Sequence, residues 1–147
     1  MIRFQYTQQL TDLINISSKL KQKANCAIHV DTGMNRLGVN IKEILKVIKL
    51  AKNKISISLI MSHLSCSENK SSKMNNLQLR RFKHVKKKLT NLNILKFSLA
   101  NSHGILLGKE FHFNLCRPGG LIYGFSLGKD KEKGLRNVIS LKAKVLQ

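Results

Sequence analysis

The chain has 147 residues, of which 42% are apolar, enough for the core of one domain or of part of a larger one. This composition excludes a disordered or collagen-like chain. No apolar run approaches the ~18 residues that span a bilayer, and the first eight residues lack the apolar segment of a signal peptide. The cysteines, Cys26, Cys66 and Cys116, stand at no metal-ligand spacing, so we expect reduced thiols in a cytoplasmic protein without a metal site or membrane span.

The formal net charge is +20, from 27 basic and 7 acidic residues. Such a charge is typical of proteins that bind nucleic acid or an anionic membrane. Only six of the basic residues are arginine, however, and arginine is the residue whose planar fork reads bases and phosphates. The lysines are spread along the chain among many Asn and Ile, as drift in the base composition of the coding DNA would produce. A basic nucleic-acid-associated protein is therefore kept as a functional hypothesis, but it ranks below the two that follow from the motifs discussed below.

The first half of the chain predicts a helix, a strand and a second helix. A helix is expected over 8–23, and the apolar run 26–30 predicts a buried strand because its apolar residues do not alternate cleanly with polar ones. Beyond it, apolar residues recur at helical spacing, at Ile41, Ile44, Leu45, Ile48 and Ala51. Asn40 and Glu43 have the spacing of an N-cap and its capping box, which predicts that this helix begins just after Asn40.

The second half repeats the pattern, with apolar runs at 55–61 and 94–99 that predict two further buried strands. A helix is expected between them over 76–89, and its buried positions are Leu79, Phe82, Val85 and Leu89. Its other faces carry basic residues that we interpret as a solvated surface, namely Arg80, Arg81, Lys83, Lys86, Lys87 and Lys88. A fourth run, 111–116, alternates polar and apolar residues and is the weakest strand prediction. Alternating helices and strands predict an α/β fold with a parallel sheet.

Polar residues follow each predicted strand. The segment 31–38 (DTGMNRLG) follows the first strand, 62–63 (Ser-His) the second and 101–102 (Asn-Ser) the third, and the fourth run leads into 117–124 (RPGGLIYG). Because parallel strands end at the same edge of a sheet, these residues lie where (β/α)8 barrels and open α/β sheets bind their ligands.

Each of these residues also has a plain structural explanation. His63 is, by itself, more often a hydrogen-bonded structural histidine than a ligand, and Arg36 is placed to pair with Asp31. Ser102 is a candidate N-cap of a helix, and the glycines 119–120 are typical of a turn after proline.

One ligand chemistry accounts for several of them together. The hydroxyl of Ser102 and the N–H groups of Gly119 and Gly120 favour a phosphate, since backbone amides bind anions. In (β/α)8 barrels the usual phosphate site follows strands seven and eight. If the last two strands here are those strands, the chain begins near strand five and forms the second half of a barrel.

Four segments resemble the successive motifs of alanine racemase, in the family's order and at about its spacing: 30–38 (VDTGMNRLG), 61–65 (MSHLS), 99–104 (LANSHG) and 117–124 (RPGGLIYG). The resemblance covers nearly the whole chain. It implies a homodimeric pyridoxal 5'-phosphate enzyme that interconverts L- and D-alanine for peptidoglycan synthesis, with an N-terminal (β/α)8 barrel and a C-terminal β domain. It also implies that residues 1–136 belong to the second half of the barrel and that 137–147 begin the β domain. Residues 141–146 resemble the first strand of that domain.

The resemblance implies roles for individual residues. Arg36 would hydrogen-bond the phenolic oxygen of the cofactor, His63 would pack beside its ring, and Arg117 would donate to its ring nitrogen. Because a guanidinium keeps its proton, that nitrogen would stay unprotonated and the ring would be a weaker electron sink, which limits side reactions. The phosphate would be held by Ser102, Gly119 and Gly120. Supporting positions are His29, Asp31, Met34, Asn101 and Tyr123.

Three positions depart from the family's usual pattern. His29 stands where the family commonly has a lysine, often carbamylated, that orients the motif's arginine. A histidine cannot carry a carbamate, so a chloride ion or an imidazole contact is the expected substitute. Gly120 replaces a usual isoleucine, which loosens the phosphate loop, and Glu68 stands where aspartate is usual.

Neither catalytic base of the family has a counterpart in the chain. No lysine lies in a motif like KANAYGHG, which carries the family's Schiff-base lysine, and neither Tyr6 nor Tyr123 lies in the motif of the catalytic tyrosine. The chain thus holds cofactor-binding residues without a catalytic residue. Three explanations stay open: a split-gene product that assembles with a complementary racemase fragment, a non-catalytic pyridoxal-phosphate-binding remnant of a decayed gene, and a part of an intact gene. We favour splitting or decay.

Overall fold

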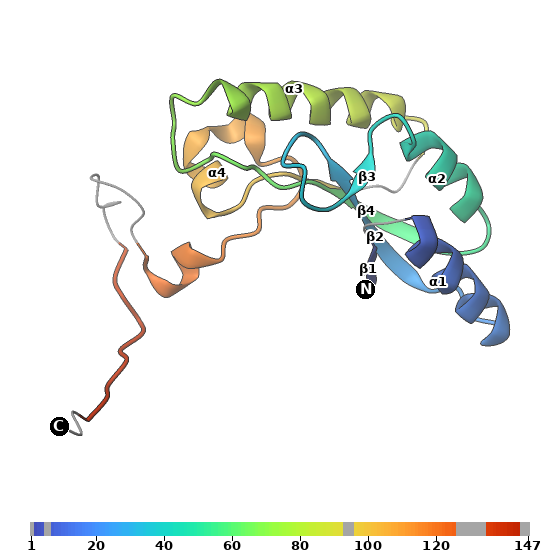
Figure 1. Ribbon diagram of the computed structural model, residues 1–147, viewed down its shortest axis with the longest axis horizontal. Helices are drawn as coiled ribbons and strands as arrows, with labels where there is room; N and C mark the ends of the chain where they lie inside the picture. The colour runs from blue at the N-terminus through green and yellow to red at the C-terminus, as the bar shows by residue number, and fades with distance from the viewer. Residues whose placement is uncertain (1, 5–6, 93–95, 126–134, 145–147) are drawn as a thin grey trace.

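The computed structural model describes residues 2–4, 7–92, 96–125 and 135–144, which form a parallel sheet with helices packed along it (Figure 1). The strands are β1 (Ile2–Phe4), β2 (Asn25–Asp31), β3 (Val39–Asn40), β4 (Ser56–Met61) and β5 (Lys96–Ser98). The α-helices are α1 (Thr7–Lys19), α2 (Ile44–Ala51), α3 (Lys73–Lys88) and α4 (Ser102–Leu107). Two short 3-10 helices follow, η1 (Lys109–Phe111) and η2 (Gly120–Tyr123).

The sheet has the order β1-β2-β4-β5, with β3 paired to β2, and every pair is parallel. Parallel neighbours need a crossover between them, and helices α1, α2 and α3 provide it. The βα pattern and the parallel sheet predicted from the sequence are therefore confirmed.

The main core lies between the sheet and these helices. Alternate residues of β2, from Cys26 to Val30, pack with the apolar faces of α1, α2 and α3 in one cluster. Phe82 of α3 is fully buried and makes edge-to-face contacts with Phe97 of β5, at 6.1 Å between ring centroids, and with Phe113, at 4.9 Å. These aromatic contacts fix α3 over the β5 side of the sheet.

Most of the predicted elements are present. The helix expected over 8–23 is α1, the runs 26–30 and 55–61 are β2 and β4, and the helix expected over 76–89 is α3. The run 94–99 contains β5, and its residues 94–95 lie outside the described part of the chain. All four predicted core positions of α3, Leu79, Phe82, Val85 and Leu89, are buried.

The fourth predicted strand, 111–116, is wrong. Phe111 ends η1, and Phe113 has φ +52°, a left-handed conformation that breaks an extended chain. The backbone touches β5 through Asn114, whose N–H donates to Phe97 O at 3.0 Å. The alternation of this run reflects separate packing of Phe111 and Phe113 against the core and not a pleated strand.

The start of α2 also differs from its prediction. Asn40 lies in β3, and its Oδ1 accepts from Lys42 N at 2.9 Å, so it caps a turn. Glu43 is the N-cap residue and makes no side-chain cap bond. The helix buries Ile44, Val47 and Ala51, while Leu45 is 49% exposed.

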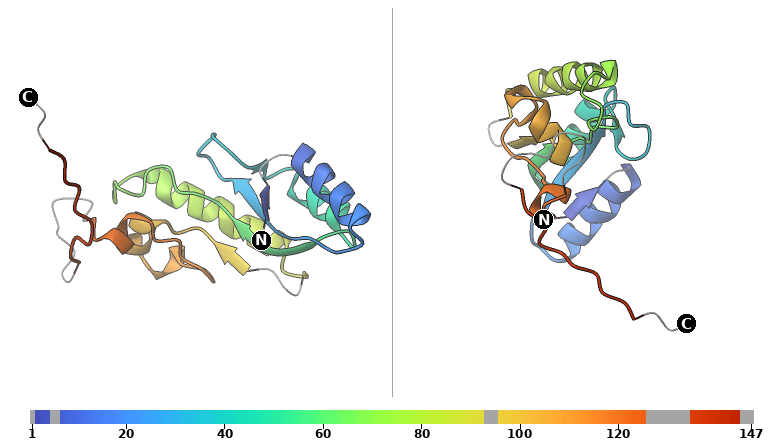
Figure 2. Two further views of the ribbon diagram at one scale, coloured as in Figure 1. Left: turned by 90° about the horizontal axis from the view of Figure 1, so that it is seen from below. Right: turned by 90° about the vertical axis from the view of Figure 1, so that its left-hand side faces the viewer.

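The sequence analysis did not predict β1, β3 or α4. Residues 135–144 continue without a helix or strand and lead away from the sheet (Figures 1 and 2). The strand predicted over 141–146 is therefore absent from 141–144, and 145–146 lie outside the described residues. No helix in the described ranges is long and apolar enough to cross a membrane.

The exposed edges of the sheet predict self-association of the isolated chain. In the described part, β1 and β5 form the two edges, and unpaired N–H and C=O groups along an edge template pairing with another strand. We expect size-exclusion chromatography to show oligomers or aggregates, and calorimetry to show no sharp unfolding transition. A monodisperse monomer that unfolds cooperatively at about 45–65 °C, as mesophile domains do, would contradict this expectation.

The buried thiol of Cys26 predicts selective alkylation. Burial raises the pKa of the Cys26 thiol from its ordinary 9.0 to about 11, so at pH 8 only about one thiol in a thousand is a thiolate, instead of about one in ten. Cys66 and Cys116 are partly exposed. Iodoacetamide at pH 8 should modify these two first, and Cys26 at least ~10-fold more slowly by peptide mass spectrometry. Equal rates in the native protein would refute the burial; equal rates in denaturant are the control.

Candidate functional site

The predicted site residues lie just past the carboxyl ends of β2, β4 and β5. The loop 31–38 leaves β2, residues 62–65 leave β4, and Asn101 and Ser102 follow β5 after two residues. Because these strands are parallel neighbours in the sheet, their carboxyl ends, and the loops that follow them, lie along one edge of the sheet, a different edge from those formed by β1 and β5. The shared position predicted for the residues after the first three strands is confirmed, whereas 117–124 follow no strand of the described chain.

The loop after β2 is shaped by Asp31. Its Oδ1 accepts from three successive N–H groups, those of Gly33 at 2.8 Å, Met34 at 3.0 Å and Asn35 at 3.2 Å. Gly38 closes the loop at φ +127°, where a Cβ atom would lie 2.6 Å from Asp31 N. This position therefore requires glycine.

Arg36 lies on this loop with its side chain exposed. Its simple pairing with Asp31 is not observed within the described residues, because the Asp31 carboxylate binds backbone amides instead. His29 lies in β2, 5% exposed, at the level of Met61 in β4. Arg36 is thus carried by a loop of fixed shape, while His29 sits in the sheet beneath it.

A buried polar network joins the loop after β2 to the loop after β4. Thr32 Oγ1 and Ser62 Oγ share a hydrogen bond of 2.7 Å. Gln78 of α3 donates through Nε2 to Thr32 Oγ1 at 3.2 Å and to His63 O at 2.9 Å. Its Oε1 accepts from Ser65 N at 2.9 Å and from Ser65 Oγ at 3.1 Å. Buried polar groups normally find partners in this way.

Arg117 joins the ends of β4 and β5. Its guanidinium donates through Nη1 to Ser98 Oγ and through Nη2 to Ser62 O. Its backbone N–H donates to Ala100 O at 2.9 Å. A permanent positive charge is therefore held at the edge where the predicted site residues gather.

Ser102 and the glycine-containing loop meet directly. Ser102 is 6% exposed at the start of α4, and its Oγ accepts from Gly119 N at 2.9 Å and from Leu121 N at 3.3 Å. A Cβ atom on Gly119 would meet nothing within 4 Å, so there is open space beside these donors. The hydroxyl and two backbone N–H groups thus lie within hydrogen-bond distance of one another, and these are the donor types that bind anions.

Ser102 is not the N-cap of α4. That residue is Asn101, whose Oδ1 accepts from Gly104 N at 2.8 Å and from Ser67 Oγ at 2.9 Å. Among the described residues, the Ser102 hydroxyl accepts hydrogen bonds from the glycine-containing loop, at Gly119 N and Leu121 N, and caps no helix. This geometry favours the phosphate hypothesis over the capping alternative.

The remaining predicted residues lie at the margin of this cluster. Gly120 begins η2, and Tyr123 ends it with 47% of its surface exposed and its ring 6.2 Å from that of Phe125. The structure brings Ser102 into contact with Gly119. It also brings Arg117 into contact with Ser62, which precedes His63 at the end of β4. Arg36 and Tyr123 are exposed and make no described hydrogen bond to these groups.

Sequence reasoning missed Gln78 and Ser98, which bind the predicted residues. Gln78 falls at helical spacing with Phe82 and Val85, on the buried face of α3. A polar residue on an apolar helix face was the available signal, because burial of an amide requires partners.

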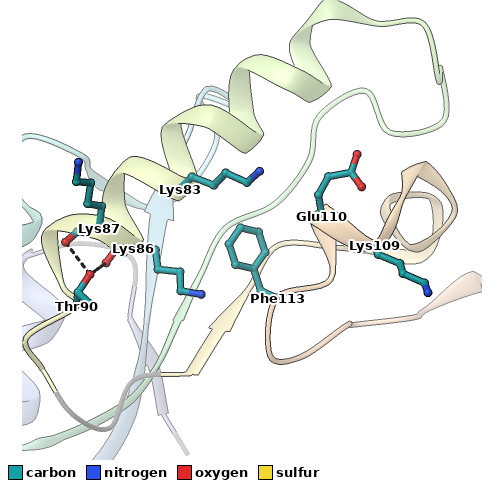
Figure 3. Close-up of a pocket in the computed structure, with 7 residues that line it drawn as sticks. All are labelled: Lys83, Lys86, Lys87, Thr90, Lys109, Glu110 and Phe113. Carbon is teal, nitrogen blue, oxygen red and sulfur yellow. Dashed lines mark hydrogen bonds between the residues drawn. The ribbon is translucent and has the colours of Figure 1, made fainter.

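In the part of the chain that the structure describes, one cavity lies beside the loop that Asp31 shapes, and another lies away from the predicted site residues. One of about 400 Å3 is lined by Asp31, Gly33, Asn35, Gly38, Asn40, Ile41, Lys42 and Arg81. The other, of about 460 Å3, lies between α3 and η1 and is lined by Lys83, Lys86, Lys87, Thr90, Lys109, Glu110 and Phe113 (Figure 3).

The lysine-lined cavity has a structural explanation. Lys86 Nζ lies 5.7 Å from the ring centroids of both Phe97 and Phe113, and lysines in the last turn of α3 complement the negative end of its dipole. Figure 3 shows Lys87 and Lys109 extending in opposite directions and not toward a common point. This agrees with the predicted solvated basic surface.

Comparison with known proteins points to one family. Residues 5–127 match the family described as alanine racemase, N-terminal domain. An alanine racemase of Rickettsia bellii (strain RML369-C) is 43% identical over 134 residues, covering 88% of this chain and 32% of that protein. The alanine racemase of Rhizobium meliloti (strain 1021) is 38% identical over 124 residues, covering 83% of this chain and 32% of that protein. This chain spans about a third of the length of these curated relatives.

A solved structure agrees. The crystal structure of alanine racemase from Bartonella henselae, with covalently bound pyridoxal phosphate, matches with a TM-score of 0.81 at 37% identity. The match covers 93% of this chain and 40% of that one.

The loop after β2 predicts a strong effect of Gly38→Ala. The positive φ and the 2.6 Å approach to Asp31 N should strain the loop by roughly 1–3 kcal/mol, which speeds amide exchange at Gly33, Met34 and Asn35 by about 5- to 100-fold. Gly119→Ala is the matched control, since its Cβ meets nothing within 4 Å. Equal exchange in the two variants, measured by mass spectrometry, would contradict the requirement for glycine at position 38.

Proposed function

The chain belongs to the family of the alanine racemase N-terminal domain, and from that premise we propose that it holds pyridoxal 5'-phosphate for the interconversion of L- and D-alanine. The same match confirms the predicted fold class, a parallel α/β sheet that is part of a (β/α)8 barrel. The observation that carries the proposal is the convergence of Gly119 N and Leu121 N on the Ser102 hydroxyl.

The residues present fit the phosphate of this cofactor. Ser102 brings an O–H donor, and Gly119 brings a backbone N–H beside open space. We assign the phosphate to these two residues and to Gly120, whose N–H opens η2. Backbone amides suit a phosphate because they donate without carrying a side chain that would block its approach.

Arg117 fits the ring end of the cofactor. Its guanidinium is held by Ser98 and Ser62 and cannot lose its proton at ordinary pH. It would donate a hydrogen bond to the ring nitrogen and leave that nitrogen unprotonated. When bound, pyridoxal phosphate supplies an electron sink for negative charge at the substrate α-carbon, and Arg117 keeps that sink moderate.

Two further residues complete the proposed contacts. His63 follows β4, its carbonyl fixed by Gln78, and would pack beside the ring. Arg36 would bind the phenolic oxygen, from the loop that Asp31 and Met34 shape. His29 stands where the family commonly has the lysine that orients this arginine. Arg36 would therefore be positioned by its loop, together with a chloride ion or an imidazole contact at that position.

The chemistry proposed for this chain is cofactor binding. The two bases of the family, a lysine and a tyrosine, have no counterpart among its residues, so racemisation would need bases from elsewhere. A second candidate is a pyridoxal-phosphate-binding module without racemase activity. Racemisation in the presence of a complementary racemase fragment favours the first, and binding without racemisation favours the second.

We assign residues 1–136 to the barrel domain and 137–147 to the start of a β domain. Support comes from 135–144, which leave the sheet and contact η2 through Val138 N, 3.3 Å from Tyr123 O. We further propose that the chain acts in the cytoplasm with a second racemase chain, as a homodimer or with a complementary fragment. The exposed edges β1 and β5 support a partner, and D-alanine for peptidoglycan would be the product.

The binding proposal predicts the effects of two substitutions. The ligand to use is pyridoxine 5'-phosphate, an alcohol that cannot condense with the chain's many lysines. Arg117→Ala and Ser102→Ala should each weaken its binding by about 10- to 100-fold in equilibrium dialysis, because each removes a hydrogen bond to the ligand worth roughly 1.5–3 kcal/mol.

Matched controls separate the site from general effects. Arg80→Ala removes an exposed charge from α3, and Ser17→Ala removes a buried hydroxyl that accepts from Ala24 N in another part of the fold. Both should bind like the unaltered chain. Equal losses in controls and site variants would refute the site, and steeply salt-dependent DNA binding that ignores all four changes would favour the nucleic-acid hypothesis.

A further inference from the structure

Gln78 is a fully buried amide on the otherwise apolar face of α3. It is 0% exposed and lies beside Leu79 and Phe82. Burial of an amide costs free energy unless its hydrogen-bonding capacity is used. Gln78 uses all of it, because both N–H groups and both lone pairs of the carbonyl have partners in the loops after β2 and β4.

The bonds of Gln78 and Arg117 meet on one dipeptide. Gln78 Nε2 donates to His63 O at 2.9 Å, and Arg117 Nη2 donates to the preceding carbonyl, Ser62 O. The end of β4 is therefore held from two sides, by α3 and by the guanidinium.

A second connection runs through Thr32. Gln78 donates to Thr32 Oγ1 at 3.2 Å, and Thr32 Oγ1 bonds Ser62 Oγ at 2.7 Å. Arg81, one turn further along α3, donates to Thr32 O at 3.1 Å. Helix α3 thus fixes Thr32 near the start of the loop that carries Arg36. Thr32 in turn bonds Ser62, whose carbonyl accepts from Arg117.

We propose that Gln78 is a positioning residue, which sets Arg117, His63 and the start of the Arg36 loop in the geometry that receives the cofactor. This inference rests on the proposed function. Gln78 touches neither cofactor nor substrate; it acts by fixing the backbone and hydroxyl groups that hold those residues. A helix of the outer layer is thereby coupled to the ligand site.

The test compares Gln78→Met with a matched variant of the same helix. Asn75 is also a buried amide, 2% exposed and one turn earlier, but its Nδ2 donates only to Asn69 O, at 2.8 Å. Gln78→Met should weaken pyridoxine 5'-phosphate binding by about 5- to 10-fold, the equivalent of one lost hydrogen bond. Asn75→Leu should leave the affinity within about twofold, although it also removes a buried bond.

A ligand-independent readout reports on Arg117 itself. Phenylglyoxal modifies accessible guanidinium groups, and peptide mass spectrometry gives the rate at each arginine. Gln78→Met should speed modification of Arg117 severalfold and leave exposed Arg80 unchanged. Asn75→Leu should alter neither rate.

Thr32→Val tests the same connection without changing α3. The substitution is nearly isosteric and removes the oxygen between Gln78 and Ser62. It should weaken binding, though no more than Gln78→Met does, because Gln78 keeps its bond to His63 O. The double variant should resemble Gln78→Met, which already breaks the connection through Thr32. If Gln78→Met fails to fold, Thr32→Val carries the test alone.

The outcomes separate this inference from the proposed function. If the unaltered chain binds the ligand and Gln78→Met or Thr32→Val behaves like Asn75→Leu in both readouts, the positioning role is overturned while cofactor binding stands. If the unaltered chain does not bind, the proposed function fails. The positioning of Arg117 is then supported by faster modification in Gln78→Met, and overturned by an unchanged rate.

Discussion

The hydrogen bonds of the Arg117 guanidinium are the interactions on which the proposed site depends. The guanidinium bonds Ser62 at the end of β4 and Ser98 in β5, so it ties two neighbouring strands at the edge where the loops leave the sheet. A guanidinium keeps its charge throughout the pH range of proteins, and its planar fork suits two acceptors at once. The guanidinium that joins the ends of β4 and β5 is thus also the group proposed to donate to the ring nitrogen of the cofactor. Loss of its bonds to Ser62 and Ser98 would therefore also disturb the proposed contact with that nitrogen.

Around this arginine, backbone and polar side chains provide the remaining order. Asp31 orders its own loop by accepting three successive N–H groups, and Asn101 caps α4. Gln78 connects the loops after β2 and β4 from helix α3. None of these residues needs to contact a ligand. Each instead orders a segment that carries proposed cofactor contacts, and hydrogen bonds offset the cost of burying the Gln78 amide.

The sequence predicted what depends on local pattern. Apolar runs and helical spacing identified β2, β4 and α3, and the pairing of Ser102 with Gly119 followed from the chemistry of phosphate binding. Prediction from the sequence failed where packing against distant residues determines the local structure. Residues 111–116 alternate like a strand, but Phe113 turns at positive φ to pack on Phe82. Gln78 was overlooked because its partners lie 13 to 46 residues away. The motif residues themselves were identified by family resemblance, which composition and periodicity do not provide.

The most direct test of cofactor binding is hydrogen exchange by mass spectrometry with and without pyridoxine 5'-phosphate. The account predicts slower exchange in peptides that cover 117–124 and 31–38, with little change in the lysine-rich end of α3, because the ligand would bind the amides of Gly119 and Gly120 and order the Arg36 loop. Protection confined to the lysine-rich helix, or absent from 117–124 at saturating ligand, would contradict the assignment of this edge of the sheet as a cofactor site.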